Sequence, residues 1–552
     1  MFEYYYTLES KGIQEFIFRG NRLKSAVGGS EIIDNVPDEL IGKLLDDIGC
    51  IEKEDYIWLS KAAGGARLLL KDKEVRRYLC KAVPIAASVY APGLTLVQAV
   101  ADFGEDSGRS ILDVMNTASE MLPERRKELF AQLPPAGPLV ERCRRTGLPA
   151  VSKDSKEGYI DEPMMMMLRN APAGQKGLIS RVLPESADIK YPVDMEELTG
   201  SENGRVAVIH CDANGLGSVL KRFLDNLKGF ANKEDTVKIY RVFCAAVQKA
   251  TEKSLKTALE PFTTLDCATR FGNSYFYPVR PLICAGDDVT IIIRSRYAIE
   301  FMDRFLSAFE ENTEEEFTKK VELPSGKAAS IAEVMARKND NPDTEKVEPM
   351  LTACGGAAFV SGHFPFYQAY EMCESLCSYA KNKTNRKASA AAFRRITTST
   401  TGDFDDVLTQ ELTIRGTDGN TVLTMMPYAT GRHKDDDGVN SPSLDDLLKL
   451  KNAVNEMPRG SMRQLINEMY AGREYAVDAF KRIIEVGVEK DKSKNKDMTE
   501  NMLKALRKIT GFDPNIPNKD GRELFTKPKK VEGINCYYTP IGDVIDLLSE
   551  ER

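Results

Sequence analysis

Short apolar runs separated by longer amphipathic segments organise residues 1–125. The short runs are rich in β-branched and aromatic residues, and they predict strands near residues 3–8, 56–60, 67–70 and 93–102. Apolar positions at helical spacing predict helices over residues 22–45, 73–82 and 107–121. Gly64-Gly65 lies between two of the apolar runs and predicts a hairpin. Helices that cross between strands in this order are typical of a ferredoxin-like sandwich.

The same order of elements returns between residues 205 and 383. Strands are predicted over residues 205–211, 282–285, 289–293 and 351–360, and helices over residues 233–259, 297–311 and 366–383. Gly286-Asp287 lies between the two middle strands and predicts a second hairpin. An acidic, polar insertion occupies residues 312–348. We therefore expect two diverged copies of one unit, although no repeat of individual residues is visible.

Two further parts of the chain do not follow this pattern. Residues 131–203 are rich in Pro, Gly and Arg and predict a connector with little regular sheet, in which Met164 to Met167 fill a core or form a contact surface. Helical periodicity at residues 443–456, 459–471 and 475–488 predicts a mainly helical C-terminal domain. The predicted fold class is α+β, with domains at residues 1–130, 131–203, 204–400 and 401–552.

Composition agrees with a globular protein of several domains. The 552 residues are too many for one compact core, and 42% hydrophobic and 29% charged residues are ordinary values. The formal charge of −7 argues against a generally basic nucleic-acid surface but allows a local basic patch. No apolar stretch is long enough for a membrane span, and the N-terminus does not have the pattern of a signal peptide. The 11 cysteines have no disulfide-like rhythm, so we expect a cytoplasmic protein.

Metal chemistry that depends on histidine or cysteine is not expected. The only histidines are His210, His363 and His433, and without a His-Asp dipeptide they exclude a histidine-rich nuclease centre. Cys373 and Cys377 lie four residues apart on a predicted helix, and two thiols do not close a zinc site. We expect both to be buried structural thiols and His210 to be a core residue.

Two acidic turns form the candidate site for chemistry. Asp212 follows an apolar strand directly, and Asp287 and Asp288 lie at the tip of the second predicted hairpin. In a palm-type sheet these positions belong to adjacent central strands, so the three carboxylates and the carbonyl of Ala213 can converge. Mg²⁺ prefers such hard oxygen ligands. Two ions about 3.5–4 Å apart can stabilise both the attacking and the leaving oxygen of a phosphoryl displacement.

Other interpretations of these turns differ in strength. A calcium loop that begins at Asp212 needs a glutamate at its twelfth position, where the chain has Phe223. The turn at Gly286 and Asp287 is, by itself, equally consistent with an ordinary hairpin, because Gly and Asp are common turn residues. The joint occurrence of two acidic turns, each at the position that a palm sheet requires, favours the metal site.

Small and basic residues near the two turns indicate phosphate binding. Glycines let a triphosphate approach the backbone, and the turn residues expected to bind nucleotide are Asn214, Gly215, Leu216, Gly217 and Gly286. Residues 378–402 include several lysines and arginines and no acid. Within them, Lys381 is the expected triphosphate contact. The alternative is a solvated helix end, where cations favour the helix dipole.

With these motifs the chain resembles the large polymerase-cyclase subunit of type III CRISPR effector complexes. That family carries two palm domains of the nucleotidyl cyclase type, with an aspartate at a strand end and a Gly-Gly-Asp-Asp hairpin. The corresponding segments are HCDANGLG and AGDD, and the later segment CGGAAFVSGHFPFYQAYEMCESLCSYAKNK contains Lys381 at the position of a family lysine. KGIQEFIFRGNRLKSAVGGSEIID is similar to the start of the family's first palm. The resemblance covers residues 1–125 and 205–400.

The resemblance also implies differences between the two palms. Arg67 and the small residues before it stand where the first palm would need acids, so that palm is expected to lack a metal site. Ser30, Arg22 and Lys24 are implied contacts of a second nucleotide, and a structural Gly-Gly-Ser turn is the alternative. Three expected departures from the family are a missing HD nuclease domain, a zinc ribbon that is missing or reduced, with only Cys143 remaining, and an alanine at the start of the AGDD hairpin.

The activity implied by the resemblance is metal-dependent nucleotidyl transfer. Family members make cyclic or linear oligoadenylates from ATP, and these second messengers activate downstream effectors in antiviral defence. Two Mg²⁺ or Mn²⁺ ions are the implied cofactors, and guide RNA and other effector subunits the implied partners. One alternative is a ribonucleoprotein scaffold with an inactive or regulated palm, in which Arg142, Arg144 and Arg145 contact RNA. Another is a stand-alone cyclase that needs no guide RNA.

Overall fold

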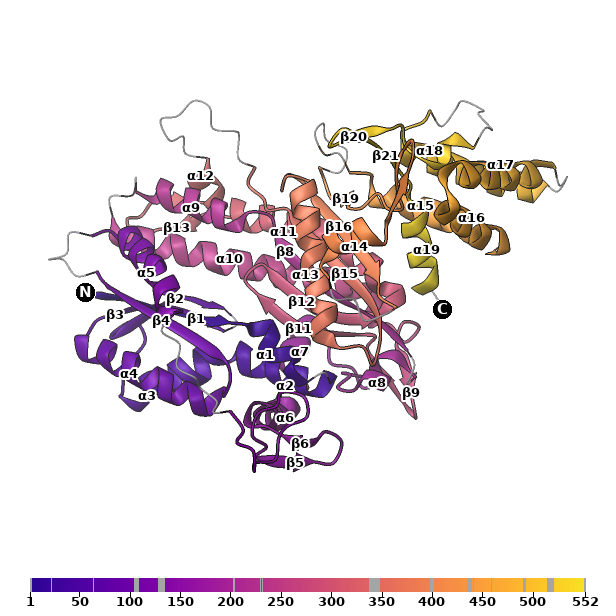
Figure 1. The fold of residues 1–552 in the computed structure, drawn as a ribbon. Helices are drawn as coiled ribbons and strands as arrows, with labels where there is room; N and C mark the ends of the chain where they lie inside the picture. Colours follow the sequence, from indigo (N-terminus) through magenta and orange to yellow (C-terminus); the bar gives the residue numbers. More distant parts are fainter. Residues whose placement is uncertain are drawn as a thin grey trace.

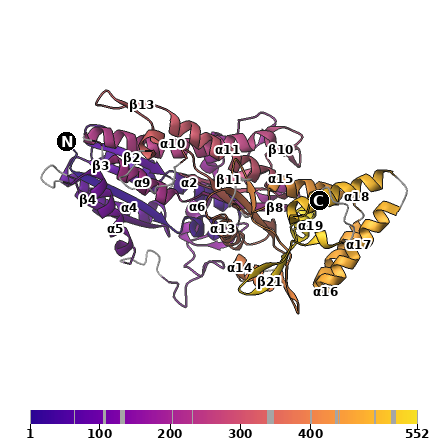
Figure 2. The ribbon, with the colours of Figure 1, turned by 90° about the horizontal axis from the view of Figure 1, so that it is seen from above.

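The computed structural model describes most of the chain. The described residues are 2–20, 22–62, 64–103, 109–127, 135–201, 204–228, 230, 232–336, 348–397, 402–433, 439, 441–457, 459–489, 493–513 and 521–550. None of the helices in these ranges is both long and apolar enough to cross a membrane. The molecule is elongated, with the N-terminal sheet and the C-terminal helices on opposite sides of a central sheet (Figures 1 and 2).

The N-terminal part is a four-stranded antiparallel sheet with helices. Its strands are β1 (Tyr4–Lys11), β2 (Tyr56–Ala62), β3 (Gly65–Leu70) and β4 (Thr95–Asp102), in the order β2-β3-β1-β4. Its helices are α1 (Ile13–Ile17), α2 (Leu23–Asp34), α3 (Lys43–Asp47), α4 (Lys73–Tyr90) and α5 (Ile111–Arg125). The first and third strands are central, as in a ferredoxin-like sheet.

The central sheet repeats this order and extends it. Its strands are β8 (Arg205–Ala213), β11 (Val279–Ala285), β12 (Asp288–Arg294), β15 (Ala353–Ser361), β16 (Ser389–Arg395) and β19 (Tyr428–Thr430), in the order β11-β12-β8-β15-β16-β19. Its helices are α9 (Leu216–Leu227), α10 (Lys233–Leu259), α11 (Ala298–Thr318), α12 (Ile331–Met335) and α13 (Phe366–Lys383). The predicted α+β class with two ferredoxin-like units is confirmed.

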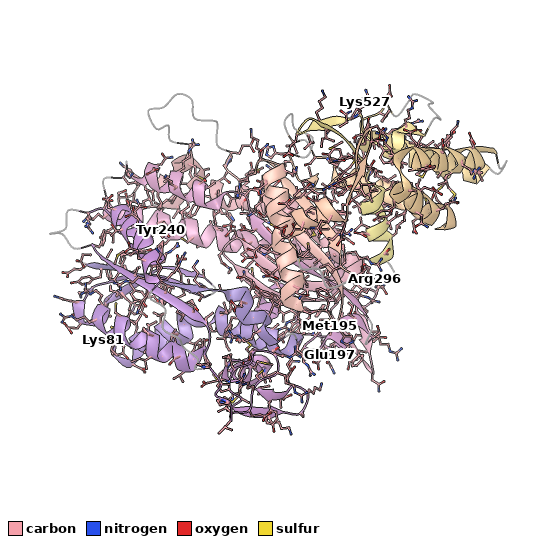
Figure 3. All side chains as sticks on the ribbon, in the orientation of Figure 1. Lys81, Met195, Glu197, Tyr240, Arg296 and Lys527 are labelled. Carbon is pink, nitrogen blue, oxygen red and sulfur yellow. The ribbon has the colours of Figure 1, made fainter. Side chains whose placement is uncertain are left out.

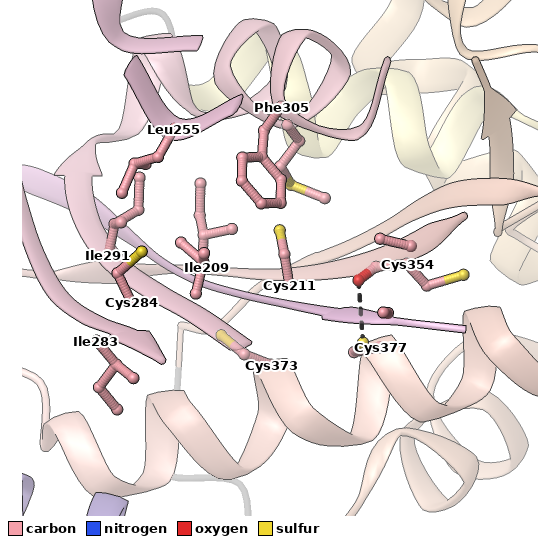
Figure 4. Packing of buried hydrophobic residues seen from close by; sticks show 14 of the residues in the cluster. Ile209, Cys211, Leu255, Ile283, Cys284, Ile291, Phe305, Cys354, Cys373 and Cys377 are labelled. Atoms are coloured by element: carbon pink, nitrogen blue, oxygen red, sulfur yellow. Dashed lines mark hydrogen bonds between the residues drawn. The ribbon is translucent and has the colours of Figure 1, made fainter. Parts of the chain in front are cut away.

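Helices cover both faces of the central sheet. A Cβ added to Gly356 on β15 would lie 2.0 Å from the carbonyl oxygen of Cys373, so α13 packs directly on this face. A Cβ on Gly355 would point to the other face, 2.9 Å from the sulfur of Cys211 and 3.2 Å from Met302 on α11. Figure 4 shows these two layers of side chains on either side of the strands. Alternate residues of β8 and β15 therefore face different helices.

The first unit packs closely against the connector and the second unit. A Cβ on Gly28 of α2 would lie 1.8 Å from the carbonyl oxygen of Met167 on α6 (Glu162–Gly174), so these helices touch backbone to backbone. Arg67 on β3 donates a hydrogen bond of 2.9 Å to the hydroxyl of Tyr240 on α10, which Figure 3 labels. Apolar residues of both sheets belong to one continuous core. The two units are thus joined by packing as well as by the chain.

The connector contains more regular structure than the sequence predicted. In addition to α6 it has the elements α7 (Gly177–Val182), α8 (Met195–Thr199), β5 (Ser152–Asp154), β6 (Gly158–Ile160) and β7 (Ile189–Lys190). β7 pairs with β10 (Ser274–Phe276), and β10 with β9 (Thr269–Phe271). Met164 and Met167 are fully buried, which makes both of them core residues.

The C-terminal part is helical but also contains a sheet that the periodicity did not reveal. Its helices are α14 (Phe404–Gln410), α15 (Leu444–Asn455), α16 (Arg459–Ala471), α17 (Arg473–Glu489), α18 (Ser493–Thr510) and α19 (Ile541–Glu550). The strands β17 (Thr413–Gly416), β18 (Gly419–Val422), β20 (Lys529–Val531) and β21 (Ile534–Tyr538) form a sheet in the order β17-β18-β21-β20. This sheet joins two segments that are far apart in the sequence.

Several element boundaries differ from the prediction for identifiable reasons. Helix α4 continues beyond Pro84 to Tyr90, although proline usually ends or kinks a helix. Helix α11 continues to Thr318, into the polar segment that was predicted as an insertion. β16 was not predicted, because its alanines have low strand propensity, yet it is buried beside β15. The insertion itself contains the short strands β13 (Val321–Glu322) and β14 (Ala328–Ala329).

Candidate functional site

Asp212 lies at the end of a buried strand and faces α13. In β8, residues from Val206 to Cys211 are buried, and Asp212 is the first with a partly exposed side chain, 38%. Its partner on β15 is Cys354. Because side chains alternate along a strand, Asp212 shares a face with His210, and that face is covered by α13. The fold therefore presents the Asp212 carboxylate at the rim of the central sheet.

The second acidic turn is a two-residue hairpin loop beside that rim. Ala285 pairs with Asp288, which leaves Gly286 and Asp287 as the loop. Gly286 has φ of 64°, a left-handed conformation that favours glycine and is usual at the first position of a type II′ turn. The β12–β8 ladder ends at Val289 opposite Cys211. One residue further along each strand, Asp288 and Asp212 are neighbours, at a spacing of roughly 5 Å between paired positions.

The third carboxyl group of the site, that of Asp287, has an unusual protonation equilibrium. Burial, the carboxylate of Asp212 with which it shares a hydrogen bond, and Asp288 together raise the pKa of Asp287 to about 8. Three negative charges at one place repel each other, so one of them is held as the neutral acid until a cation compensates. The site is therefore deficient in positive charge.

Lys381 supplies part of that charge. Its side chain, only 8% exposed, reaches from the last turn of α13, and its ammonium forms an ion pair with Asp212. The same Nζ donates a hydrogen bond of 2.9 Å to the carbonyl oxygen of Ala213. Burial lowers the pKa of Lys381, but Asp212 and the nearby Cys377 thiol outweigh that effect, so its pKa is raised. The lysine thus binds two of the four groups that the sequence proposed as metal ligands.

His210 also belongs to this neighbourhood and is not merely a core residue, as the sequence had suggested. Its Nδ1 lies 3.2 Å from the Asp288 carboxylate and 3.4 Å from the Thr290 hydroxyl, and its ring packs edge-on against Tyr370 at 5.3 Å. Burial lowers the pKa of His210, but Asp288 outweighs it and raises the pKa overall. The alternation of β8, which places His210 on the same face as Asp212, was the signal that could have revealed this contact.

The turn after Asp212 combines a structural residue with open space. Asn214 is buried, and its Nδ2 donates to the Thr352 hydroxyl at 2.9 Å and to the Ala388 carbonyl at 3.0 Å. Gly215 precedes α9, and Leu216 and Gly217 begin that helix. A Cβ on Gly215, Gly217 or Gly286 would meet no atom within 4 Å. Open glycines beside the N-terminus of a helix make a suitable approach for a phosphate group.

Two residues proposed for a second nucleotide are used in packing. Ser30 is buried in α2 and donates a hydrogen bond to the carbonyl of Leu282 on β11. Arg22 forms an ion pair of 2.5 Å with the carboxylate of Glu157 in the connector. Both contacts fit the structural alternative for this segment, since they join the first unit to β11 and to the connector.

Other cations of the basic segment contact the C-terminal part or are exposed. Arg394 lies 3.0 Å from Asp546 on α19 and 3.0 Å from Glu411, and Arg395 lies 3.2 Å from Glu550. Lys383 is exposed, with its ammonium 5.4 Å from the ring centre of Tyr379. Lys381 is thus a cation of this segment that forms an ion pair with the acidic turns.

The donor atoms fit a hard divalent cation, although they are not arranged as a finished metal site. Within the described ranges, no three His, Cys, Asp or Glu side chains are grouped as metal ligands. However, the Lys381 ammonium contacts both Asp212 and the Ala213 carbonyl, and its positive charge acts there as that of a bound metal ion would. A buried oxygen of Asp288 has no partner in hydrogen-bond geometry, although the His210 Nδ1 lies 3.2 Å from it. Carboxylate and carbonyl oxygens are the ligands that Mg²⁺ and Mn²⁺ prefer.

Gln248 is a further residue at the site that the sequence did not reveal. It lies on α10, on the side of the hairpin opposite to α13, and its Oε1 accepts a hydrogen bond of 2.7 Å from the Gly286 amide. A glutamine in the middle of an amphipathic helix carries no signal of such a role, because the contact joins residues 38 positions apart.

Comparison with known proteins gives structural neighbours only. No family profile and no curated protein sequence match the chain. One structural neighbour is the Csm1–Csm4 cassette in complex with cA4, at 14% identity and a TM-score of 0.43. The alignment covers 71% of this chain and 54% of the neighbour. The Csm1–Csm4 subcomplex of the type III-A CRISPR-Csm interference complex has 12% identity and a TM-score of 0.45, and covers 82% and 62%.

A third neighbour is a Csm1–Csm4 cassette in complex with one ATP. It has 12% identity and a TM-score of 0.44, with 92% of this chain and 70% of the neighbour covered. Csm1 is the large subunit of these complexes, the family that the sequence motifs resemble. The chain spans just over half the length of the first of these neighbours.

Proposed function

We propose that the chain is a metal-dependent nucleotidyltransferase that joins ATP into cyclic or linear oligonucleotides and releases pyrophosphate. One observation carries the proposal: two acidic turns, 75 positions apart in the sequence, meet on adjacent strands, where a buried lysine already binds Asp212 and the Ala213 carbonyl. Residues that only stabilise a fold do not need three carboxyl groups of which one is kept from ionising.

Each residue of the site has a distinct role in this proposal. Asp212, Asp287, Asp288 and the carbonyl of Ala213 would hold Mg²⁺ or Mn²⁺, which supplies positive charge to the attacking and leaving oxygens of the transfer. Lys381 would bind oxygens of the donor triphosphate, since its ammonium lies within the site on a helix that packs directly against the sheet. His210 would orient the carboxylate of Asp288.

The surrounding elements would position the substrates. The N-terminus of α9 and the open glycines before it would accept the triphosphate. The first unit, whose α2 packs against β11 through Ser30, would border the acceptor nucleotide. Positioning and charge compensation then supply most of the rate acceleration, as in other phosphoryl transfers. ATP as the substrate, guide RNA and effector subunits as partners, and a role in antiviral defence follow from the motif resemblance.

A decisive experiment compares the purified chain with an Asp287→Ala/Asp288→Ala variant in labelled ATP with Mg²⁺ or Mn²⁺. We expect pyrophosphate and oligoadenylate or cyclic products from the unmodified chain only. The matched control is Asp405→Ala/Asp406→Ala, which removes two adjacent, exposed aspartates of α14 and is expected to retain activity. Reactions with and without bound RNA separate a guide-dependent enzyme from a stand-alone one.

A scaffold role is the second candidate, and it is favoured by the ion pair between Lys381 and Asp212. That pair neutralises one carboxylate, and among the described residues no three-ligand metal group is formed. A chain that turned over no nucleotide under any condition, with its native partners present, would overturn the synthase proposal and leave the scaffold role in its place.

A further inference from the structure

The side-chain amide of Gln248, on α10, forms hydrogen bonds with the backbone at and just before the acidic hairpin loop. Its Oε1 accepts a hydrogen bond of 2.7 Å from the Gly286 amide, and its Nε2 donates one of 3.3 Å to the Cys284 carbonyl. These two backbone groups belong to residues one and three positions before Asp287. A single side chain on α10 therefore contacts the loop at two points.

The orientation of this amide is determined by a third contact. Nε2 also donates a hydrogen bond of 2.9 Å to the carboxylate of Glu252, one helical turn further along α10. If the amide were rotated by half a turn, its oxygen would face two other acceptors and its NH₂ group would face the Gly286 N–H. Glu252 therefore directs the oxygen of Gln248 toward Gly286.

The hairpin loop needs such a support for a structural reason. In a two-residue loop the amide at the first loop position does not take part in the ladder, and here the ladder closes with the pair Ala285 and Asp288. Gly286 also has open space on its side-chain position, so packing does not restrain it. β11 is the edge strand of the central sheet. Without Gln248 the loop that carries Asp287, and that precedes Asp288 directly, would lose this restraint.

We propose that Gln248 is a positioning residue for the Gly286–Asp287 hairpin loop, and that Glu252 holds Gln248 in the orientation required. Gln248 does not contact the reacting groups; it fixes the backbone from which they project. The catalytic consequence rests on the proposed nucleotidyl transfer. A misplacement of about 1 Å can lower a rate by about 100-fold, so even a small movement of the loop would be measurable.

The test uses Gln248→Met, which keeps the length of the side chain and removes its polar atoms. We expect kcat for ATP turnover to fall by about 10- to 100-fold while KM for ATP changes by less than about threefold, because the loop carries carboxylates and not the main triphosphate contacts. Amide exchange at Gly286 is expected to be at least about tenfold faster, a readout that needs no activity.

Two further variants keep the inference falsifiable. Gln98→Met is the matched control: Gln98 on β4 accepts a hydrogen bond from the Tyr6 hydroxyl at 2.9 Å and donates one to the Cys80 carbonyl at 2.8 Å, in the first unit. We expect Gln98→Met to lower the free energy of unfolding by about as much as Gln248→Met does, and to leave kcat unchanged. The exchanged pair Gln248→Glu/Glu252→Gln conserves charge and keeps an oxygen facing Gly286, so it is expected to recover most of the lost rate.

The outcomes separate this inference from the proposed function. Normal kcat in Gln248→Met, in a chain that makes product, would overturn the positioning role alone. A fall in kcat of the same size in Gln98→Met would also overturn it, because the loss would then be one of general stability. If the unmodified chain made no product, the proposed function would fail, and unchanged amide exchange at Gly286 in Gln248→Met would overturn the contact independently.

Discussion

Lys381 is a buried cation that forms an ion pair with Asp212 and has a proposed role in binding the triphosphate. Its ammonium competes with any cation for Asp212 and the Ala213 carbonyl. We predict that Lys381→Met binds Mn²⁺ at least about tenfold more tightly in the absence of nucleotide, equivalent to about 1.4 kcal/mol, because a competing positive charge is removed. The same variant should turn over ATP far more slowly, because it lacks the proposed triphosphate contact. Calorimetric titration with Mn²⁺ and a turnover assay measure the two effects.

The matched control for this prediction is Lys383→Met. Lys383 is exposed near the same end of α13 and lies over the ring of Tyr379. It should leave both Mn²⁺ affinity and turnover close to the values of the unmodified chain. Weaker Mn²⁺ binding in Lys381→Met would contradict the view that the lysine stands in for a cation.

A second residue, Asp543 on α19, predicts a pH dependence of stability. Burial raises its pKa to about 7, although its carboxyl group accepts hydrogen bonds from the Tyr428 hydroxyl at 2.6 Å and the Met425 amide at 2.9 Å. The folded chain therefore retains this proton between the ordinary pKa of 3.8 and about 7, and the unfolded chain does not. The free energy of unfolding that this group contributes is largest below pH 3.8. It decreases as the pH rises above 3.8 and is lost once the pH has passed about 7.

We therefore expect Asp543→Asn to remove this dependence. The amide oxygen can still accept from Tyr428 and Met425, and it has no proton to lose. In urea unfolding between pH 5 and 8, the variant should gain stability relative to the unmodified chain as the pH rises. A difference that stayed constant over this range would show that Asp543 titrates at an ordinary pKa.

At the scale of the elements, the contact between α13 and the central sheet decides where Lys381 lies. Gly356 permits that contact, since a Cβ there would lie 2.0 Å from the Cys373 carbonyl oxygen. We expect Gly356→Ala to lower the free energy of unfolding by about 1–3 kcal/mol and to reduce turnover, because α13 must move away from β15. Urea denaturation and the turnover assay measure both effects.

Gly217→Ala is the counterpart of Gly356→Ala at an open position. Gly217 lies at the start of α9, and a Cβ there would have no atom within 4 Å. Alanine is a better helix former by up to about 1 kcal/mol, so stability should be unchanged or higher. If the triphosphate lies along this turn, KM for ATP should rise several-fold. An unchanged KM would place the triphosphate elsewhere.

At the scale of the whole molecule, Arg280 joins the connector to β11, an edge strand of the central sheet and part of the acidic hairpin. The guanidinium on β11 is buried, and it donates to the carbonyl groups of Gly174, of Gln175 at 3.1 Å and of Pro192 at 3.4 Å. Burial lowers its pKa to about 10. We expect Arg280→Met to reduce the free energy of unfolding by about 2–3 kcal/mol, since several buried carbonyls lose their donor.

Arg296→Met is the control for this prediction. Arg296 is exposed beside the ring of Tyr297, and Figure 3 shows it at the edge of the central unit. Its replacement should change stability by less than about 0.5 kcal/mol. Equal effects of the two substitutions would mean that the connector is not held to β11 through Arg280.

The sequence alone determined the order of the main elements of the two ferredoxin-like units and the location of the acidic turns. Both depend on neighbours along the chain. Apolar alternation predicts strands, helical spacing predicts α10 and α13, and Gly286 permits the left-handed residue of the hairpin loop. Two repeats of this order were enough to predict both ferredoxin-like sheets.

Only the tertiary structure decided which side chains meet. Lys381 is 169 positions from Asp212, and Gln248 is 38 from Gly286, so neither contact leaves a local pattern. The use of Ser30 in packing was equally hidden, because a buried hydroxyl and one that contacts a nucleotide look the same in sequence. The alanine-rich β16 became a strand because β15 and β19 pair with it, against its own propensity. A sequence pattern depends on residues that are close along the chain, whereas a site consists of residues that only folding brings together.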